Sequence, residues 1–250
     1  MTGAASPRLL AALALVATGL PAHAADPSTY LLQPIVTLGE HEIDFHLGAG
    51  SGGRSTPPER AAGLGFGMAL SQRWYSEVAV QYQRVGSLAT QFDAVEWENI
   101  VQLAEQGDWP VDAGVLVEVE RPRAEDEGPS LRLGALLQKD WGRFEFNGNL
   151  IASRHVHSAR FESVQWRYQF QAKYRDTREF EYGVQAFGTP SSSARSWEDY
   201  QRQVHRVGPA VMGKFSLENE RSLSYNAAIL FGTTDHSPDR TFRLQMEYEF

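Results

Sequence analysis

The last nine residues alternate without interruption between apolar and polar side chains. In a strand, successive side chains point to opposite faces, so one face is apolar and the other charged or polar. Such a strand separates two environments. It fits a half-buried strand of a soluble sandwich, and it equally fits an outer-membrane β-barrel with lipid outside and water inside. The apolar face holds Phe242, Leu244, Met246, Tyr248 and Phe250, and the polar face holds Arg243, Gln245, Glu247 and Glu249.

The same two-residue period recurs along the chain between clusters of turn-forming residues. It predicts an all-β fold, an antiparallel transmembrane β-barrel of about 12 strands, and an even number is what single-chain bacterial barrels have. The expected strands are 40–48, 61–70, 73–83, 91–103, 110–120, 130–139, 142–153, 160–173, 178–187, 204–217, 222–231 and 240–250.

The connections between these strands alternate between long and short. Outer-membrane barrels have long extracellular loops and short periplasmic turns, so the alternation favours a barrel with both ends in the periplasm. The long connections are expected near 49–60, 84–90, 121–129, 154–159, 188–203 and 232–239.

The amino end has the features of a secretory signal. Arg8 precedes an uncharged apolar run from Leu9 to Leu20, and small residues follow at Ala22 and Ala24. This pattern predicts cleavage after Ala24, and the apolar run is too short to span a bilayer as a helix. The expected organisation is a signal peptide over 1–24, an N-terminal periplasmic segment over 25–39 and a barrel over 40–250, located in the outer membrane.

Composition narrows the function. The chain has no cysteine, which excludes disulfides and thiolate metal sites. The formal net charge of −8 argues against nucleic acid as a partner. The mean hydropathy of −0.38 and the charges within every later apolar run argue against helical membrane spans, whereas a barrel with a polar lumen remains compatible with both. No phosphate loop or dinucleotide fingerprint is present, so no cofactor is expected.

Most of a set of eight aromatic residues lie near the ends of the expected strands, where aromatic girdles of membrane barrels lie, and single ones such as Trp97 fit a core aromatic equally. They are Trp74, Tyr75, Trp97, Trp109, Trp166, Tyr168, Tyr225 and Tyr248.

Two resemblances to known proteins rest on short segments of the sequence. The terminal Phe250, with Tyr248 two residues earlier and apolar residues at further two-residue steps, resembles the C-terminal assembly signal that the barrel assembly machinery reads; the further residues are Met246, Leu244 and Phe242. The segments 97–103, 109–114, 137–142, 205–209 and 246–250 resemble a family of proteobacterial outer-membrane proteins, described as transporter-like and distantly similar to the barrels of the meta-pathway for phenol degradation. The resemblance implies an outer-membrane barrel and carries no site residue with it.

Charged residues that alternate onto the polar face of the expected strands would line the lumen, and they are the candidates for its functional residues. Facing cations and anions would form a selectivity filter, or they would close a lumen that is only moderately wide. The candidates are Glu77, Arg132, Arg143, Glu145, Arg167, Glu179, Glu181, Arg243, Glu247 and Glu249.

Three weaker candidates for chemistry remain. His155 and His157 point the same way in a strand and would share a metal if His205 or Glu162 converged on them. A lipid hydrolase would use Ser153 or Ser158 with these histidines, but no orienting acid is evident. The acidic run Glu125-Asp126-Glu127 lacks the spacing of a calcium loop.

The sequence therefore predicts a channel or binding barrel for a small polar or aromatic solute, without chemistry. A lipid-modifying enzyme, a plugged structural or surface barrel, and a soluble sandwich are the alternatives. Expected partners are outer-membrane lipid and lipopolysaccharide, the barrel assembly machinery and a small solute.

Overall fold

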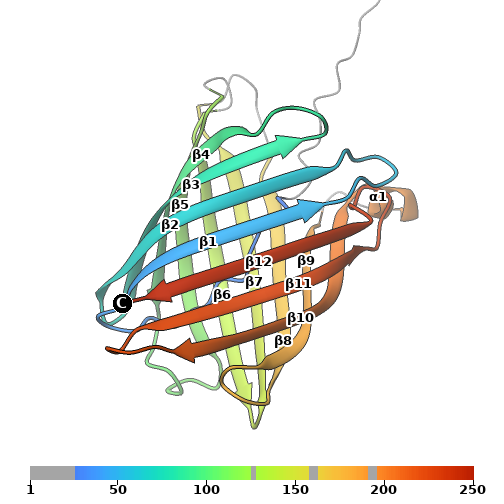
Figure 1. The fold of residues 1–250 in the computed structure, drawn as a ribbon. Coiled ribbons are helices and arrows are strands. Elements are labelled where there is room, and N and C mark those ends of the chain that lie inside the picture. Colours follow the sequence, from blue (N-terminus) through green and yellow to red (C-terminus); the bar gives the residue numbers. More distant parts are fainter. Residues whose placement is uncertain (1–25, 125–127, 158–162, 191–195) are drawn as a thin grey trace, which may run out of the picture.

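A computed structural model describes residues 26–124, 128–157, 163–190 and 196–250. In these residues 12 antiparallel strands form one closed barrel (Figure 1). The strands are β1 (His41–Gly50), β2 (Glu59–Ser71), β3 (Trp74–Val85), β4 (Gln91–Gln102), β5 (Asp112–Pro122), β6 (Ser130–Trp141), β7 (Phe144–His155), β8 (Gln165–Arg175), β9 (Glu181–Thr189), β10 (Val204–Ser216), β11 (Ser222–Gly232) and β12 (Arg240–Glu249).

The expected fold is confirmed, and each expected strand overlaps an observed one. The starts of β8 and β9 differ most from expectation: residues 163–164 and 178–180 precede the observed strands, and residues 160–162 lie outside the described part of the chain. The connection between β9 and β10 holds a short helix, α1 (Trp197–Gln201), which begins with a capping box between Ser196 and Asp199. Within the described residues no helix is long and apolar enough to cross a membrane.

The barrel closes where β12 pairs with β1. Leu244 lies opposite Leu47, and Tyr248 lies opposite Ile43. The backbone N–H of Phe250 donates to the carbonyl of His41 at 2.9 Å, so the ladder continues to the last residue. Every strand therefore has two neighbours, and the sheet has no open edge.

The two faces of the wall differ in polarity. Large apolar side chains such as Leu64, Val78 and Leu150 are about half exposed on the outside. Their sequence neighbours point inward and are buried and mostly polar, as Asn147 and Asn149 in β7 illustrate. An apolar exterior around a polar interior is the arrangement of a transmembrane barrel.

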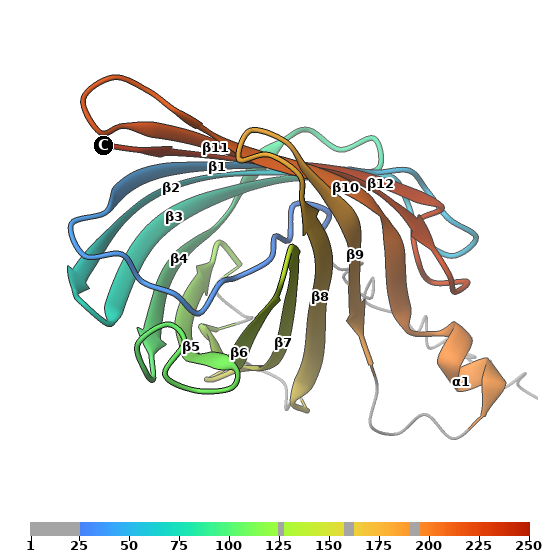
Figure 2. The ribbon, with the colours of Figure 1, turned by 90° about the horizontal axis from the view of Figure 1, so that it is seen from below.

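The segment expected in the periplasm lies inside the barrel. Seen along the barrel in Figure 2, the blue chain before β1 runs within the ring of strands. Leu31, Leu32 and Val36 are buried there. The described part of the segment expected over 25–39 thus packs its apolar residues against the inner wall of the barrel.

The aromatic prediction needs one correction. Trp74, Trp97 and Trp166 are exposed on the outside, and Trp109 is exposed in the connection between β4 and β5, whereas Tyr75 is buried and faces the lumen. Trp74 and Tyr75 are adjacent in β3, so only one of them can face outward.

Replacing Leu150 by lysine tests the exterior face. Leu150 lies near the middle of β7 and is 49% exposed. A lysine at mid-membrane depth should lower the free energy of unfolding in lipid vesicles by about 2–4 kcal/mol. Urea titration followed by gel mobility of unboiled samples measures it. Leu150→Met is the matched control, and equal stability of both variants would contradict a lipid-facing Leu150.

Candidate functional site

The segment before β1 passes down the lumen from the far end of β1 toward its start. The carbonyl of Asp26 lies 3.4 Å from Arg206 Nη2, near the start of β10. Pro27 packs against Gly48 so closely that a Cβ there would overlap its backbone. The chain then reaches Glu40, next to β1. Residues 26–40, here called the lumenal segment, thus span much of the barrel's length.

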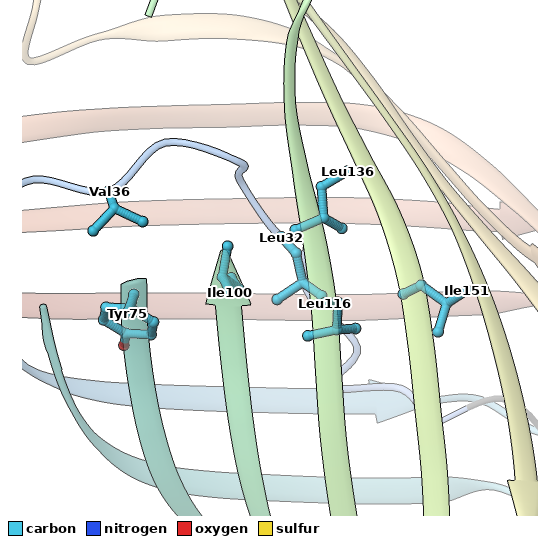
Figure 3. Close-up of a cluster of buried hydrophobic side chains, with 7 residues drawn as sticks. All are labelled: Leu32, Val36, Tyr75, Ile100, Leu116, Leu136 and Ile151. Atoms are coloured by element: carbon cyan, nitrogen blue, oxygen red, sulfur yellow. The ribbon is translucent and has the colours of Figure 1, made fainter. Parts of the chain in front are cut away.

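An apolar seat on the inner wall holds this segment. Figure 3 shows Leu32 and Val36 of the lumenal segment facing five side chains from adjacent strands, and all are buried. Register places Tyr75 beside Ile100, and Ile100 beside Leu116. The seat comprises Tyr75, Ile100, Leu116, Leu136 and Ile151.

Polar side chains of the wall bind the backbone of the same segment. The N–H of Leu32 donates to Gln169 Oε1 at 3.2 Å, and its carbonyl accepts from Asn149 Nδ2 at 2.9 Å. The N–H of Val36 donates to Gln102 Oε1 at 2.9 Å. Buried backbone groups require such partners, so these amides fix the segment in place.

The sequence contains a pattern that indicates this seat, although the alternation of apolar and polar residues alone does not reveal it. Ile100, Leu116, Leu136 and Ile151 occupy positions of lumenal parity in four consecutive strands. Aliphatic side chains gain nothing by facing a wet lumen. A row of them on the polar face therefore indicates an apolar occupant of the lumen.

A cavity of about 800 Å³ lies beside and below the lumenal segment. Its lining includes Tyr30, Leu31 and Leu32 of that segment and reaches Glu249 at the end of β12. Nine acidic side chains and four basic ones line it. We call this space the acidic vestibule. Its acidic residues are Glu40, Glu42, Asp44, Glu77, Glu98, Glu145, Glu181, Glu247 and Glu249.

Side-chain cations neutralise part of the vestibule. Lys173 Nζ lies 2.7 Å from Glu181 and 3.3 Å from Glu145. Lys214 pairs with Glu249. Burial and the carboxylates of Glu42 and Glu249 raise the pKa of Glu40, which precedes β1, to about 7.

Arginines gather in the other half of the lumen. Arg132 forms ion pairs with Glu96, Glu118 and Glu120, at 3.2 Å for Glu96. Arg243 donates to Gln185. Two other nitrogens of Arg243 and two nitrogens of Arg206 are buried without a hydrogen-bond partner among the described residues. Arg167 also has a buried, unpartnered Nε.

The structure thus distributes the ten charged candidates among three places. Glu77, Glu145, Glu181, Glu247 and Glu249 line the vestibule, whereas Arg132, Arg167 and Arg243 lie outside its lining. Arg143 and Glu179 depart from expectation, because they lie in the β6–β7 and β8–β9 turns and are exposed. Alternation predicts the face of a residue only within a strand, and both strands begin after these residues.

The candidates for chemistry do not assemble. His155 Nδ1 lies 3.2 Å from the carbonyl of Gly128, and His157 is exposed in the following loop. His205 instead contacts Tyr168 and Gln203, at 3.1 and 2.9 Å.

Ser153 is buried on the lumenal side, away from the lipid face where a lipid hydrolase would act. Glu162, Ser158 and the acidic run 125–127 lie outside the described residues.

The residues of the expected assembly signal follow the outer face of the closing strand. Phe242 and Phe250 are exposed, while Leu244, Met246 and Tyr248 are half-buried. The rings of Tyr248 and Phe250 stack with centroids 5.8 Å apart.

Comparison with solved structures identifies the fold. The COG4313 outer membrane channel from Pseudomonas putida F1 matches with a TM-score of 0.59 and 11% identity, over 90% of this chain and 98% of that one. The NanC porin matches with a TM-score of 0.55 and 9% identity, over 83% and 98%. The KdgM porin matches with 0.51 and 8%, over 84% and 98%. At these identities the likeness concerns the fold alone. No family model and no curated protein matches the sequence.

The seat of the lumenal segment can be tested with Leu32→Asp. Leu32 is 6% exposed, and its burial contributes roughly 1.5–3 kcal/mol. A carboxylate there should release the segment and increase its cleavage by a protease added to the purified barrel. Leu38→Asp is the matched control, because Leu38 belongs to the same segment and is 61% exposed. Equal cleavage of the two variants would contradict the seat.

Proposed function

We propose that this protein is an outer-membrane channel for small solutes, exported with a signal peptide cleaved after Ala24. The observation that carries the proposal is the acidic vestibule, a polar cavity of about 800 Å³ enclosed by a closed barrel. Cavities of about 300–1,000 Å³ accommodate small molecules. The fold shared with porins and channels supports the same function.

The lumenal segment narrows the pathway that a solute would take through the barrel. Tyr30, Leu31 and Leu32 belong to the lining of the vestibule, so the segment forms part of its wall. A solute that crosses the barrel has to pass beside this segment or displace it. Removal or release of the segment should therefore widen the pathway.

The charge of the vestibule favours cations. Acidic side chains outnumber basic ones by nine to four, and low-dielectric walls strengthen their field. Rings of acidic side chains give cation selectivity in channels. A small solute with a positive charge, or a polar solute without charge, fits this lining better than an anion.

The solute is expected to be small and either polar or aromatic. The family resemblance implies no particular substrate, so this finer identity remains a prediction. The proposal also includes assembly by the barrel assembly machinery through Tyr248 and Phe250, in contact with outer-membrane lipid and lipopolysaccharide. Phe250 suits that role because its side chain lies exposed beside the closing seam.

Conductance in planar lipid bilayers tests the proposed channel. We expect discrete conductance steps and a reversal potential that shows cation preference under a salt gradient. Glu247→Lys should lower the cation-to-anion permeability ratio at least about two-fold, because it replaces an acidic side chain of the vestibule with a cation.

Glu179→Lys is the matched control for that variant. Glu179 undergoes the same substitution but lies exposed in a turn outside the vestibule lining. An absence of conductance steps from folded protein, in both the wild type and a variant lacking residues 26–38, would refute the channel.

The pKa of Glu40 generates a pH prediction. With a pKa of about 7, its carboxyl group gains a negative charge as the pH rises through neutrality. Cation preference should therefore increase between about pH 6 and pH 8. Glu40→Gln should reduce this increase, as measured by reversal potentials at each pH. An unchanged increase in the variant would remove Glu40 from the explanation.

A further inference from the structure

One group of side chains at the wall of the acidic vestibule has the composition of a metal site. Asp44 and His46 are two residues apart on β1, and Glu77 lies on β3. All three are buried, at 2%, 1% and 4% exposure. One ligand atom from each lies within 4.8 Å of the others.

Strand β2 is shaped so that the three side chains can meet. In the register of the sheet, Asp44 lies opposite Gly65 and His46 lies opposite Gly63, both on β2. The carboxylate of Glu77 occupies the space that a Cβ on Gly65 would fill. The absence of a side chain at Gly65 therefore allows Glu77 to reach across β2 toward β1.

The atoms that would bind a metal are available. Asp44 Oδ1 and His46 Nε2 are buried and form no hydrogen bond, although His46 Nε2 lies 3.0 Å from Asp44 Oδ2. That separation matches neighbouring ligands around one ion, because metal–ligand distances of about 2.0–2.2 Å place adjacent ligand atoms roughly 3 Å apart. Gln245 orients Asp44 at 3.1 Å, and Tyr75 orients Glu77 at 2.7 Å.

The charge of this group is not matched by a protein cation. Two other acidic groups in the lumen have a comparable spacing. Arg132 pairs with one of them and Lys214 with the other. Among the described residues, neither Asp44 nor Glu77 forms an ion pair with a lysine or arginine, and two buried carboxylates without a cation are costly.

We propose that Asp44, His46 and Glu77 bind a divalent first-row transition metal ion such as Zn²⁺. Two carboxylates and a neutral imidazole supply a charge of −2, which a divalent ion neutralises. The imidazole nitrogen selects a transition metal, since Ca²⁺ and Mg²⁺ prefer oxygen ligands. Asp44 and Glu77 line the vestibule, so the ion enters from that side.

The site also contacts the lumenal segment. The ring of Tyr30 lies over His46 with centroids 4.1 Å apart, and its hydroxyl donates to Glu98 at 3.3 Å. Tyr30 thus covers the imidazole from the side of the lumenal segment.

Zinc binding to the purified, full-length barrel in detergent tests the proposal. Isothermal titration with ZnCl₂, after removal of metals by a chelating resin, should give one site per barrel that CaCl₂ does not occupy. His46→Gln and Asp44→Asn should each weaken zinc binding at least about ten-fold. Co²⁺ added in place of Zn²⁺ should produce a visible absorption band that His46→Gln abolishes.

Two further variants separate loss of the site from loss of the fold. Gly65→Ala keeps every ligand but blocks the path of Glu77, so it should weaken zinc binding while the unboiled gel mobility stays that of the folded barrel. His157→Asn removes an exposed imidazole at a residue with a φ of 58°, which asparagine adopts readily, and should leave binding unchanged.

Zinc binding of equal strength in the wild type, His46→Gln and Asp44→Asn would overturn the proposal, as would an absence of binding by the folded wild-type barrel. Both results are independent of conductance. A barrel that binds zinc without conducting would leave the metal site standing and remove the channel.

Discussion

Closure of the hydrogen-bonded ladder between β1 and β12 is the constraint on which the rest of the structure depends. In lipid every backbone N–H and C=O needs a partner within the protein, and only a closed sheet supplies one for every strand. Closure also separates two faces completely. Apolar side chains such as Leu64 and Leu150 cover the outside, and polar ones such as Asn147 fill the inside. The function of the lumen therefore depends on the inward-facing residues of a ring of 12 strands and on the chain segment that this ring encloses.

The lumen of this ring is divided by the lumenal segment. Residues 26–40 bring apolar side chains into a polar interior. The wall binds them through an apolar seat around Leu116, and its side-chain amides bind the backbone of the segment. Apolar packing and polar binding act on the same few residues, so the position of the segment is well defined. The space that remains is the acidic vestibule. The segment is thereby both a barrier in the pathway and part of the surface that a solute would meet.

Charge is arranged unevenly along the lumen, and local partners decide what each group can do. Arg132 holds three glutamates, and Lys214 holds Glu249, so these groups stabilise the wall. Asp44 and Glu77 have no such cation among the described residues. The glycines of β2 leave room for them to meet His46. The glycines of β2 thus determine which carboxylates lie close together.

The sequence by itself determined the barrel, because alternation in strands such as β7 and β12 is local and repeats at every strand. It also predicted most of the long connections, but the connection 103–111, expected to be short, is longer than 86–90, expected to be long. It did not determine where chain segments distant in sequence meet. Arg143 and Glu179 lie in turns just before strands, so they do not face the lumen. Tyr75 faces the lumen because it lies opposite Ile100 in the sheet. Only the tertiary structure placed Leu32 inside the ring and Glu77 beside His46, because both contacts join segments that no local periodicity relates.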